Sequence, residues 1–216
     1  MLKKNLKTLI VTSIVTLLPI LVGLLLWDKL PEQMPFHWGP SGEVDGWTSK
    51  QMAVLLMPFI LVAIEWFCAW AANLDPKANN IANKSLKLIL WFIPVLSIFI
   101  NGIVYLSALG HDVSVEVIMP AFMGVIFMII GNYLPKCKQS YTLGIKLPWT
   151  LHDEENWNRT HRFAGKLWFI GGLLMICTSF LGSFVAFGII TALMILIPTV
   201  YSYKLFKTKN TEELKK

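Results

Sequence analysis

The stretch from Gly144 to Arg162, GIKLPWTLHDEENWNRTHR, gathers residue types that can do chemistry. His152 and His161 could ligate a metal or move protons, but they are nine positions apart, so on a helix they point half a turn away from each other and cannot share a metal. His161 could act in acid–base chemistry, although the neighbouring Arg162 is expected to lower its pKa. The stretch is too polar and too aromatic for a simple connector, so it is the first candidate for function.

Motifs typical of enzymes are missing from the sequence. It contains no His-Glu-x-x-His pair, no glycine-rich phosphate loop with lysine, and no Gly-x-Ser-x-Gly turn. Cys68, Cys137 and Cys177 share no short spacing, so neither disulfides nor zinc are indicated, and we expect them to be small buried hydrophobic residues. We therefore predict that the protein is not an enzyme and holds no cofactor or metal.

The composition indicates a membrane protein. Of 216 residues, 55% are hydrophobic and only 15% are charged, whereas soluble domains carry about 25% charged residues. The net charge of +6 is spread between apolar runs instead of forming the patch of a nucleic-acid-binding domain. We therefore predict an all-α integral membrane protein that contacts the lipid bilayer and does not bind nucleic acid directly.

The elements that must position the polar stretch are transmembrane helices. A span needs about 20 apolar residues, and six segments qualify, the fifth only if Lys166 reaches the interface: 8–27, 51–72, 86–109, 117–134, 165–182 and 184–203. The first run is too long for a signal peptide and lacks a cleavage site of small residues, so we read it as an anchor.

Basic residues predict the orientation of these spans. With both termini cytoplasmic, only Lys29 and Lys50 of the 19 Lys and Arg residues lie outside, as the positive-inside rule requires. Loop 28–50 is then outside and loop 135–162 inside. We divide the chain into a two-span unit at 1–72, a linking span at 73–116, a module at 117–203 and a basic cytoplasmic tail at 204–216.

Loop 28–50 is rich in proline and glycine, which forbid a long helix and favour turns. It reads either as a lid anchored in the headgroups by its tryptophans or as a recognition surface. For recognition we single out His37, Trp38, Asp45 and Trp47.

Loop 135–162 should combine an extended part with a helix. Thr150 is the expected N-cap, with Asp153 at the third helical position and acids in the first turn, where the helix dipole favours them. Glu155 and Arg159 form an i,i+4 pair, and Arg162 is expected near the end of the helix. Four residues fall on one face at helical spacing: Trp157, His161, Ala164 and Trp168.

Glu65 is the one carboxylate within the apolar part of a span. Such groups are costly and usually face the interior of a bundle. It could be a proton or ion site, or a structural group partnered with Asn101 of the third span or kept protonated. The structural interpretation is favoured because a transporter usually has more than one such group.

The segments GNYLPK, LGIKLPWTL and WNRTHRFAGKLWFIGG resemble the C-terminal module of SdpI-type bacterial immunity proteins, and MPFHWGPSGEVDGWTSK is similar to a small domain of unknown function that often precedes it. Lys146 and Leu147 depart from the Arg-Thr expected there, and lysine cannot make the bidentate contacts of arginine. The matching positions are Gly131, Asn132, Pro135, Gly144, Ile145, Pro148, Trp149, Thr150, Trp157, Arg162 and Gly165.

The resemblance implies a multi-pass protein of the bacterial cell membrane that protects against an SDP-like peptide toxin. It also implies signalling, in which a transcriptional repressor of ArsR type is held at the cytoplasmic face. The expected contact residues of loop 135–162 and its flanks are Asn132, Pro135, Gly144, Ile145, Lys146, Pro148, Trp149, Thr150, Trp157, His161 and Arg162. The alternatives are a small transporter or channel using Glu65 and an enzyme or maturation factor using His161.

Overall fold

The computed structural model describes residues 2–182 and 184–213. Its contacts divide the chain into two compact units, residues 1–74 with 83–115, and residues 75–82 with 116–216. The helix of the third predicted span thus packs with the first two helices, and the segment predicted as a separate link at 73–116 is divided between the units.

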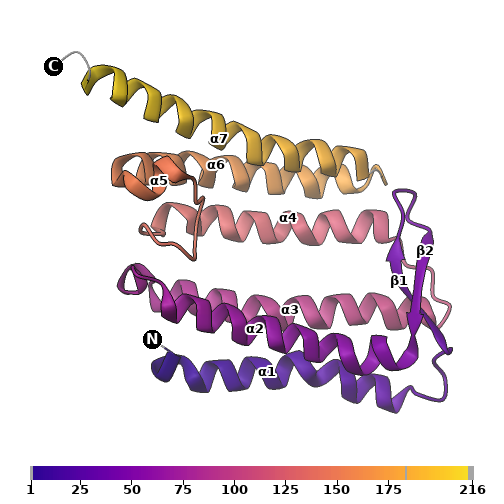
Figure 1. The fold of residues 1–216 in the computed structure, drawn as a ribbon. Coiled ribbons are helices and arrows are strands. Elements are labelled where there is room, and N and C mark those ends of the chain that lie inside the picture. The colour runs from indigo at the N-terminus through magenta and orange to yellow at the C-terminus, as the bar shows by residue number, and fades with distance from the viewer. Residues whose placement is uncertain (1, 183, 214–216) are drawn as a thin grey trace. The chain divides into compact units, whose positions relative to one another are not determined.

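The first unit is built on three long helices, α1 (Leu2–Leu25), α2 (Met57–Leu74) and α3 (Asn83–Ala108), which lie side by side (Figure 1). A π-helical turn, Met52–Leu56, precedes α2. A core of apolar side chains lies where the hairpin described below meets the ends of α1 and α3, and consists of Leu30, Met34, Ala53, Val54, Val104 and Tyr105. Loop 28–50 is therefore packed onto the helices of its own unit.

Loop 28–50 folds as an antiparallel β-hairpin of β1 (Gln33–Trp38) and β2 (Val44–Ser49). No helix forms there, as predicted, but the strands are an addition to the all-α fold that we expected. Gly42 closes the turn with a φ of +81°, and its N–H donates to the Gly39 carbonyl at 2.9 Å. Glycine adopts this left-handed backbone without the strain that a Cβ would cause.

The second unit contains α4 (Val115–Tyr133), the short α5 (Pro148–His152), α6 (Glu154–Ser179) and α7 (Phe184–Glu213), with α4, α6 and α7 side by side (Figure 1). Two 3₁₀ turns, Ala78–Asn80 and Leu134–Lys136, flank its loops. Helix α7 continues without a break to Glu213. Most of the predicted tail at 204–216 is therefore the last part of this helix and not a separate segment.

Close backbone contact joins α4 and α6 at two pairs of glycines. A Cβ on Gly124 would lie 2.5 Å from the Gly172 carbonyl oxygen, and one on Gly131 would lie 2.7 Å from that of Gly165. Small residues let membrane helices approach in this way. The family-type residues Gly131 and Gly165 thus have a packing role.

Five of the described helical segments are long and apolar enough to cross a membrane: Lys4–Leu25, Met52–Leu74, Asn83–Ala108, Val115–Lys136 and Phe184–Glu212. They match five of the six predicted spans. The fifth predicted span, 165–182, forms the second half of α6 as far as Ser179, and the charged first half of that helix keeps it outside this set. Six spans with both ends in the cytoplasm remain a prediction.

The three cysteines are less enclosed than expected. Cys68 and Cys137 are half-buried and Cys177 is exposed on α6. In a membrane protein the surface of a span faces lipid, so an apolar side chain does not need a protein core around it.

Candidate functional site in loop 135–162

Asp75 ties the start of loop 135–162 to the short segment 75–82 of the same unit. Its buried carboxylate accepts backbone N–H groups of Lys77 at 2.8 Å, Tyr141 at 2.9 Å and Thr142 at 2.8 Å. Such bonds to a charged acceptor are stronger than those between neutral groups. Two turns of chain far apart in sequence are therefore held by one side chain.

Gln139 extends this attachment further into the loop. The Asn80 amide donates to its backbone carbonyl at 2.7 Å, and the Lys77 ammonium donates to its side-chain oxygen. Its own amide donates to the Thr150 carbonyl at 2.7 Å. The extended part of the loop, although without regular structure, is thus held by hydrogen bonds at Gln139, Tyr141 and Thr142.

Thr150 is not the N-cap that the sequence suggested. It lies inside α5, fully buried, where its hydroxyl accepts the Leu147 N–H at 2.9 Å and has its one proton within reach of the Ile145 and Leu147 carbonyls, each at 2.9 Å. The cap of α6 is Asp153, whose carboxylate accepts N–H groups of Glu155 at 2.9 Å and Asn156 at 3.2 Å. Thr150 and Asp153 are both capping types, and the break between α5 and α6 decides which one caps the long helix.

Asp153 also contacts the far end of α7, because Lys209 lies 2.9 Å from its carboxylate. Burial disfavours the charged carboxylate, but the hydrogen bond and charge of Lys209, together with the N–H donors at the start of α6, outweigh this and lower the pKa of Asp153. The predicted i,i+4 pair is also present, with Arg159 and Glu155 3.4 Å apart.

A tight cluster forms around Gly144. Trp157 is completely buried, donates its indole N–H to the Cys137 carbonyl at 2.8 Å, and stacks on the His161 ring at a centroid distance of 4.0 Å. Gly144 has a φ of +110°, and a Cβ there would lie 2.5 Å from His161 Nε2 and 2.7 Å from the Trp157 ring. Only glycine fits this position, for reasons of space and of backbone conformation.

His161 links the helix to the loop. Its Nε2 accepts the Ile145 N–H at 2.8 Å, which places the ring proton on Nδ1, where it donates to the Trp157 carbonyl at 2.8 Å. Burial lowers the pKa of His161 to about 4, partly opposed by the bond to the Trp157 carbonyl, so the ring is neutral at pH 7. The direction matches the prediction, but the cause is burial and not Arg162.

Trp149 joins the loop to α7. Its indole N–H donates to the Ser202 hydroxyl at 2.7 Å, and its ring stacks with Phe206 at a centroid distance of 5.9 Å and meets Tyr203 edge-on at 5.4 Å. The indole therefore has a defined position on α7.

Ser202 belongs to a buried polar network that sequence reasoning missed. Its hydroxyl donates to the Asn156 side chain at 2.9 Å, the Asn156 amide donates to the Ser202 carbonyl at 3.0 Å, and Thr160 donates to Asn156 at 3.0 Å. A serine within an apolar span and the i,i+4 spacing of Asn156 and Thr160 were available signals. Nothing in the sequence pointed to Asp75.

The residues predicted to contact a partner therefore separate into two groups. Thr150, Trp157 and His161 are buried and hold the loop together. Gly144 and Ile145 belong to the same cluster and are half-buried, as is Trp149 against α7. The exposed members are Asn132, Pro135, Lys146, Pro148 and Arg162.

Two of these exposed residues, Asn132 and Pro135, line an open groove of about 350 Å³ with Gly165, Lys166 and Phe169 of α6. Lys146 donates to the Thr142 carbonyl at 3.3 Å. Arg162 lies in the third turn of the continuous α6, so the expectation that it lies near the end of the helix is wrong.

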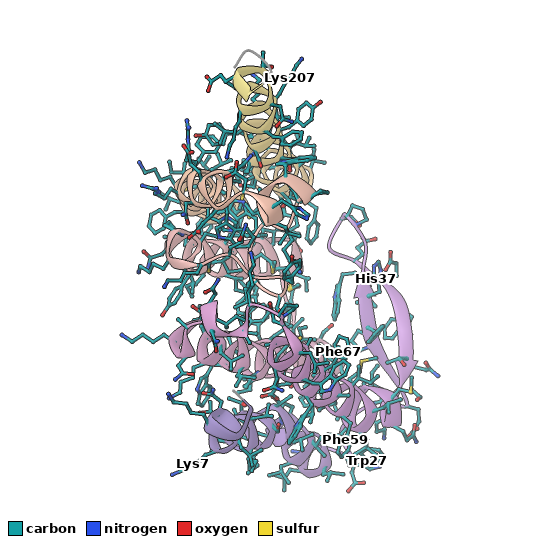
Figure 2. The ribbon with its side chains drawn as sticks, turned by 60° about the vertical axis from the view of Figure 1, so that its left-hand side comes forward. Lys7, Trp27, His37, Phe59, Phe67 and Lys207 are labelled. Atoms are coloured by element: carbon teal, nitrogen blue, oxygen red, sulfur yellow. The ribbon has the colours of Figure 1, made fainter. Side chains whose placement is uncertain are left out.

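In the first unit, the predicted contact residues of the hairpin are accessible. Figure 2 labels His37, whose Nδ1 lies 2.5 Å from the Asp45 carboxylate, with both side chains exposed. Trp47 is 59% exposed, and Trp38 is half-buried. Lys50, by contrast, is buried and paired with Glu32 at 2.9 Å.

Glu65 and Asn101 do not contact each other as suggested. Glu65 is fully buried and bonds hydroxyls of α1, whereas the Asn101 amide donates to the Ser97 carbonyl of its own helix at 2.8 Å. Helix α1, which supplies three hydroxyls at the level of Glu65, was the overlooked partner.

Comparison with known proteins agrees with this organisation. Residues 136–202 match the SdpI/YfhL protein family, and residues 14–62 match a domain of unknown function, DUF1648. The chain is 24% identical to "Immunity protein SdpI" of Bacillus subtilis (strain 168) over 216 residues, covering 96% of this chain and 98% of that protein. No solved structure matches. The family match spans the network of α5, α6 and α7 described above, and the similarity to SdpI runs from end to end, so the chain resembles SdpI-type immunity proteins and is a multi-pass protein of the cell membrane.

Proposed function

We propose that this protein protects the cell that carries it against an SDP-like antimicrobial peptide. The observation that carries the proposal is the similarity to an immunity protein over nearly the whole of both chains. A match of that extent includes both the hairpin and loop 135–162. It therefore supports a function that the whole protein has in common with SdpI, and not one that is limited to a single common module.

Within this proposal, the hairpin is the surface that meets the peptide. Trp47 and Phe36 are large apolar side chains that remain 59% and 46% exposed, and aromatic side chains are common anchors in interfaces. Asp45 and Glu43 add exposed acids, while the nearby Lys50 is already neutralised by Glu32. A cationic, apolar peptide is the partner that this surface suits best.

Loop 135–162 is the proposed signalling surface on the cytoplasmic side, where a transcriptional repressor of ArsR type is held. Its buried network fixes the backbone, and Lys146, Pro148 and Arg162 project from it into solvent. A surface held rigid before binding loses less conformational entropy when a partner docks. Repressor capture is the finer part of the proposal and is tested separately from protection.

Protection is tested by expressing the chain in toxin-sensitive bacteria and measuring survival with the peptide. Trp47→Ala should reduce protection strongly while the protein accumulates normally. Trp70→Ala is the matched control, because Trp70 is 52% exposed on α2 and lies outside the hairpin. Equal protection by both variants would contradict the role of the hairpin, and failure of the wild-type chain to protect would contradict the proposed function itself.

Signalling is tested with Trp149→Ala and Arg162→Ala, which should abolish protection or repressor capture at unchanged membrane levels. Trp149→Ala removes the ring that docks on α7, and Arg162→Ala removes an exposed charge. Arg159→Ala is the control for Arg162, since it is an exposed arginine one turn earlier that pairs with Glu155. Full activity of both test variants would reduce the loop to a structural element.

The proposed orientation is tested by cysteine labelling in intact cells that carry a cysteine-free parent. Ser41→Cys and Ser114→Cys, both at exposed positions, should react with an impermeant reagent. Lys138→Cys is the better test of loop 135–162, since Ser140 is only 1% exposed and would escape labelling on either side. Reaction of Lys138→Cys in intact cells would reverse the assignment of loops to faces.

For a small transporter or channel, Glu65 would have to exchange with a pathway through the protein. Its side chain is 0% exposed and is covered by α1. This enclosure favours a fixed group over a transport site, so immunity is the function we propose.

A further inference from the structure

Glu65 lies in the middle of α2, and no charged side chain among residues 2–182 and 184–213 pairs with it. Its side chain is fully buried, and its contacts come from three hydroxyl groups of α1, those of Thr12, Ser13 and Thr16. Among the ion pairs of the described residues, none includes Glu65. Burying an unpaired carboxylate in apolar surroundings is strongly unfavourable, and within a bilayer such groups require a specific explanation.

Counting the hydroxyl protons shows what the carboxyl group can receive. Each hydroxyl has one proton. Ser13 Oγ lies 2.8 Å from the Leu9 carbonyl but 3.3 Å from Glu65 Oε2. Thr16 Oγ1 lies 2.9 Å from the Thr12 carbonyl but 3.5 Å from Glu65 Oε2. The hydroxyls of Ser13 and Thr16 therefore donate to backbone carbonyls of α1 in preference to the Glu65 carboxyl group.

Thr12 is the remaining donor, and it too has a partner within α1. Its hydroxyl lies 2.9 Å from the Thr8 carbonyl and also makes the closest contact in the cluster, with Glu65 Oε1. If Thr12 donates to Thr8, the proton in the contact with Glu65 must come from the carboxyl group. In that arrangement Thr12 donates to Thr8 and accepts from Glu65, as Ser13 donates to Leu9 and accepts from the Trp66 indole.

Neighbouring donors are already engaged elsewhere. The Trp66 indole N–H donates to Ser13 at 3.0 Å. From α3, the Ser97 hydroxyl donates to the Thr16 carbonyl at 2.8 Å and the Asn101 amide donates to Ser97. These α3 groups are uncharged, and so are the three hydroxyls of α1. Within the part of the chain that the structure describes, the polar groups around Glu65 therefore supply neither a countercharge nor a free donor.

We propose that Glu65 is a proton-binding site within the membrane-spanning part of the first unit, in which the carboxylic acid donates to Thr12 Oγ1 and Thr12 donates to the Thr8 carbonyl. A bridging metal cation would hold the Glu65 and Thr12 oxygens further apart than a direct hydrogen bond does. The ligand is therefore a proton. The bound proton joins α2 to α1, and its loss would leave an unpaired charge between the two helices.

The test is infrared spectroscopy of the purified full-length protein in lipid bilayers, in which a protonated carboxylic acid gives a carbonyl band that a carboxylate lacks. We expect this band at pH 7, and we expect Glu65→Gln to remove it. If that variant does not accumulate, glutamate labelled with ¹³C in the wild-type protein must shift the band. No protonated-acid band at pH 7 would overturn the proposal.

Thr12→Val then tests the geometry, because valine keeps the shape but removes the acceptor. The band should move to the frequency of an acid without a hydrogen bond. Thr191→Val is the matched control, since the Thr191 hydroxyl in the second unit donates within its own helix, at 2.8 Å to the Phe187 carbonyl, and the band should stay in place. If adding Na⁺ at pH 7 removed the band, a cation would have displaced the proton from Glu65, and the proposal would also be overturned. These readouts do not depend on protection against a peptide.

Discussion

The two long loops use similar residue types in opposite ways. In the hairpin, a histidine, an acid and a tryptophan that we singled out are exposed: His37, Asp45 and Trp47. In loop 135–162, His161 and Trp157 are buried, and the exposed residues surround them. A histidine and a tryptophan in a polar loop can therefore be either a presented surface or the core that holds a surface in place.

Hydrogen bonds explain the difference. The hairpin is held by its strand pairing and a small apolar core, so its polar side chains remain available. Loop 135–162 has little regular structure before α5, and its backbone groups are paired instead by side chains such as those of Asp75, Gln139 and His161. Buried polar groups must be paired, so this loop has a fixed shape only if those side chains are kept.

Gly144→Ala should have the largest effect on this contrast. The left-handed backbone and the overlap with His161 and Trp157 together should cost about 2–5 kcal/mol of unfolding free energy. Gly42→Ala in the hairpin should cost only about 1–2 kcal/mol, from backbone strain. Thermal unfolding of both variants in detergent measures the difference, and equal losses would remove the distinction between the two loops.

A pH dependence should come from His161. Because burial lowers its pKa to about 4 from an ordinary 6.5, the unfolded chain takes up a proton first as the pH falls. Stability from this group is complete above about pH 6.5 and is lost towards pH 4, by at most about 3 kcal/mol. Limited proteolysis of loop 135–162 between pH 7 and pH 4 measures this loss.

His161→Gln should flatten that part of the profile, since glutamine has no proton to gain in this range. An unchanged profile would assign the pH dependence to other groups. The hairpin sites of proteolysis in the same samples serve as the internal comparison between the two loops.

Asp75→Ala should destabilise loop 135–162 by about 2–3 kcal/mol, because three backbone N–H groups lose a charged acceptor. Asp45→Ala is the matched change in the hairpin, where an exposed pair with His37 contributes about 0–1 kcal/mol. Hydrogen exchange of the Tyr141 and Thr142 amides reports the first change directly. Protection of those amides in the Asp75 variant would show that the attachment lies elsewhere.

Glu154→Gln should have the smallest effect, within about 0.5 kcal/mol. Glu154 is exposed in the first turn of α6, where Asp153 already caps the helix and Glu155 also serves the dipole. A large loss of stability or protection would contradict this expectation, because it would mean that Glu154 makes a contact beyond those of the described residues.

Much of the architecture follows from the sequence. Long apolar runs place five of the membrane-spanning helices, since nothing else can pair the backbone of such runs in a bilayer. Helical spacing also predicts the buried face of α6 that includes Trp157, His161 and Ala164, and the Glu155–Arg159 pair. These features depend on neighbours within a few residues, which the sequence displays directly.

Tertiary structure alone decides which polar residues are paired inside the protein. Thr150 and Asp153 are both good caps, and the break after His152 gives the role to Asp153. Trp149 finds its partner at Ser202, Tyr141 and Thr142 find theirs at Asp75, and Glu65 finds Thr12. Each of these bonds joins positions more than fifty residues apart. A hydrogen bond needs its two atoms within about 3 Å, and the sequence around one polar residue does not show which distant group folding will bring that close.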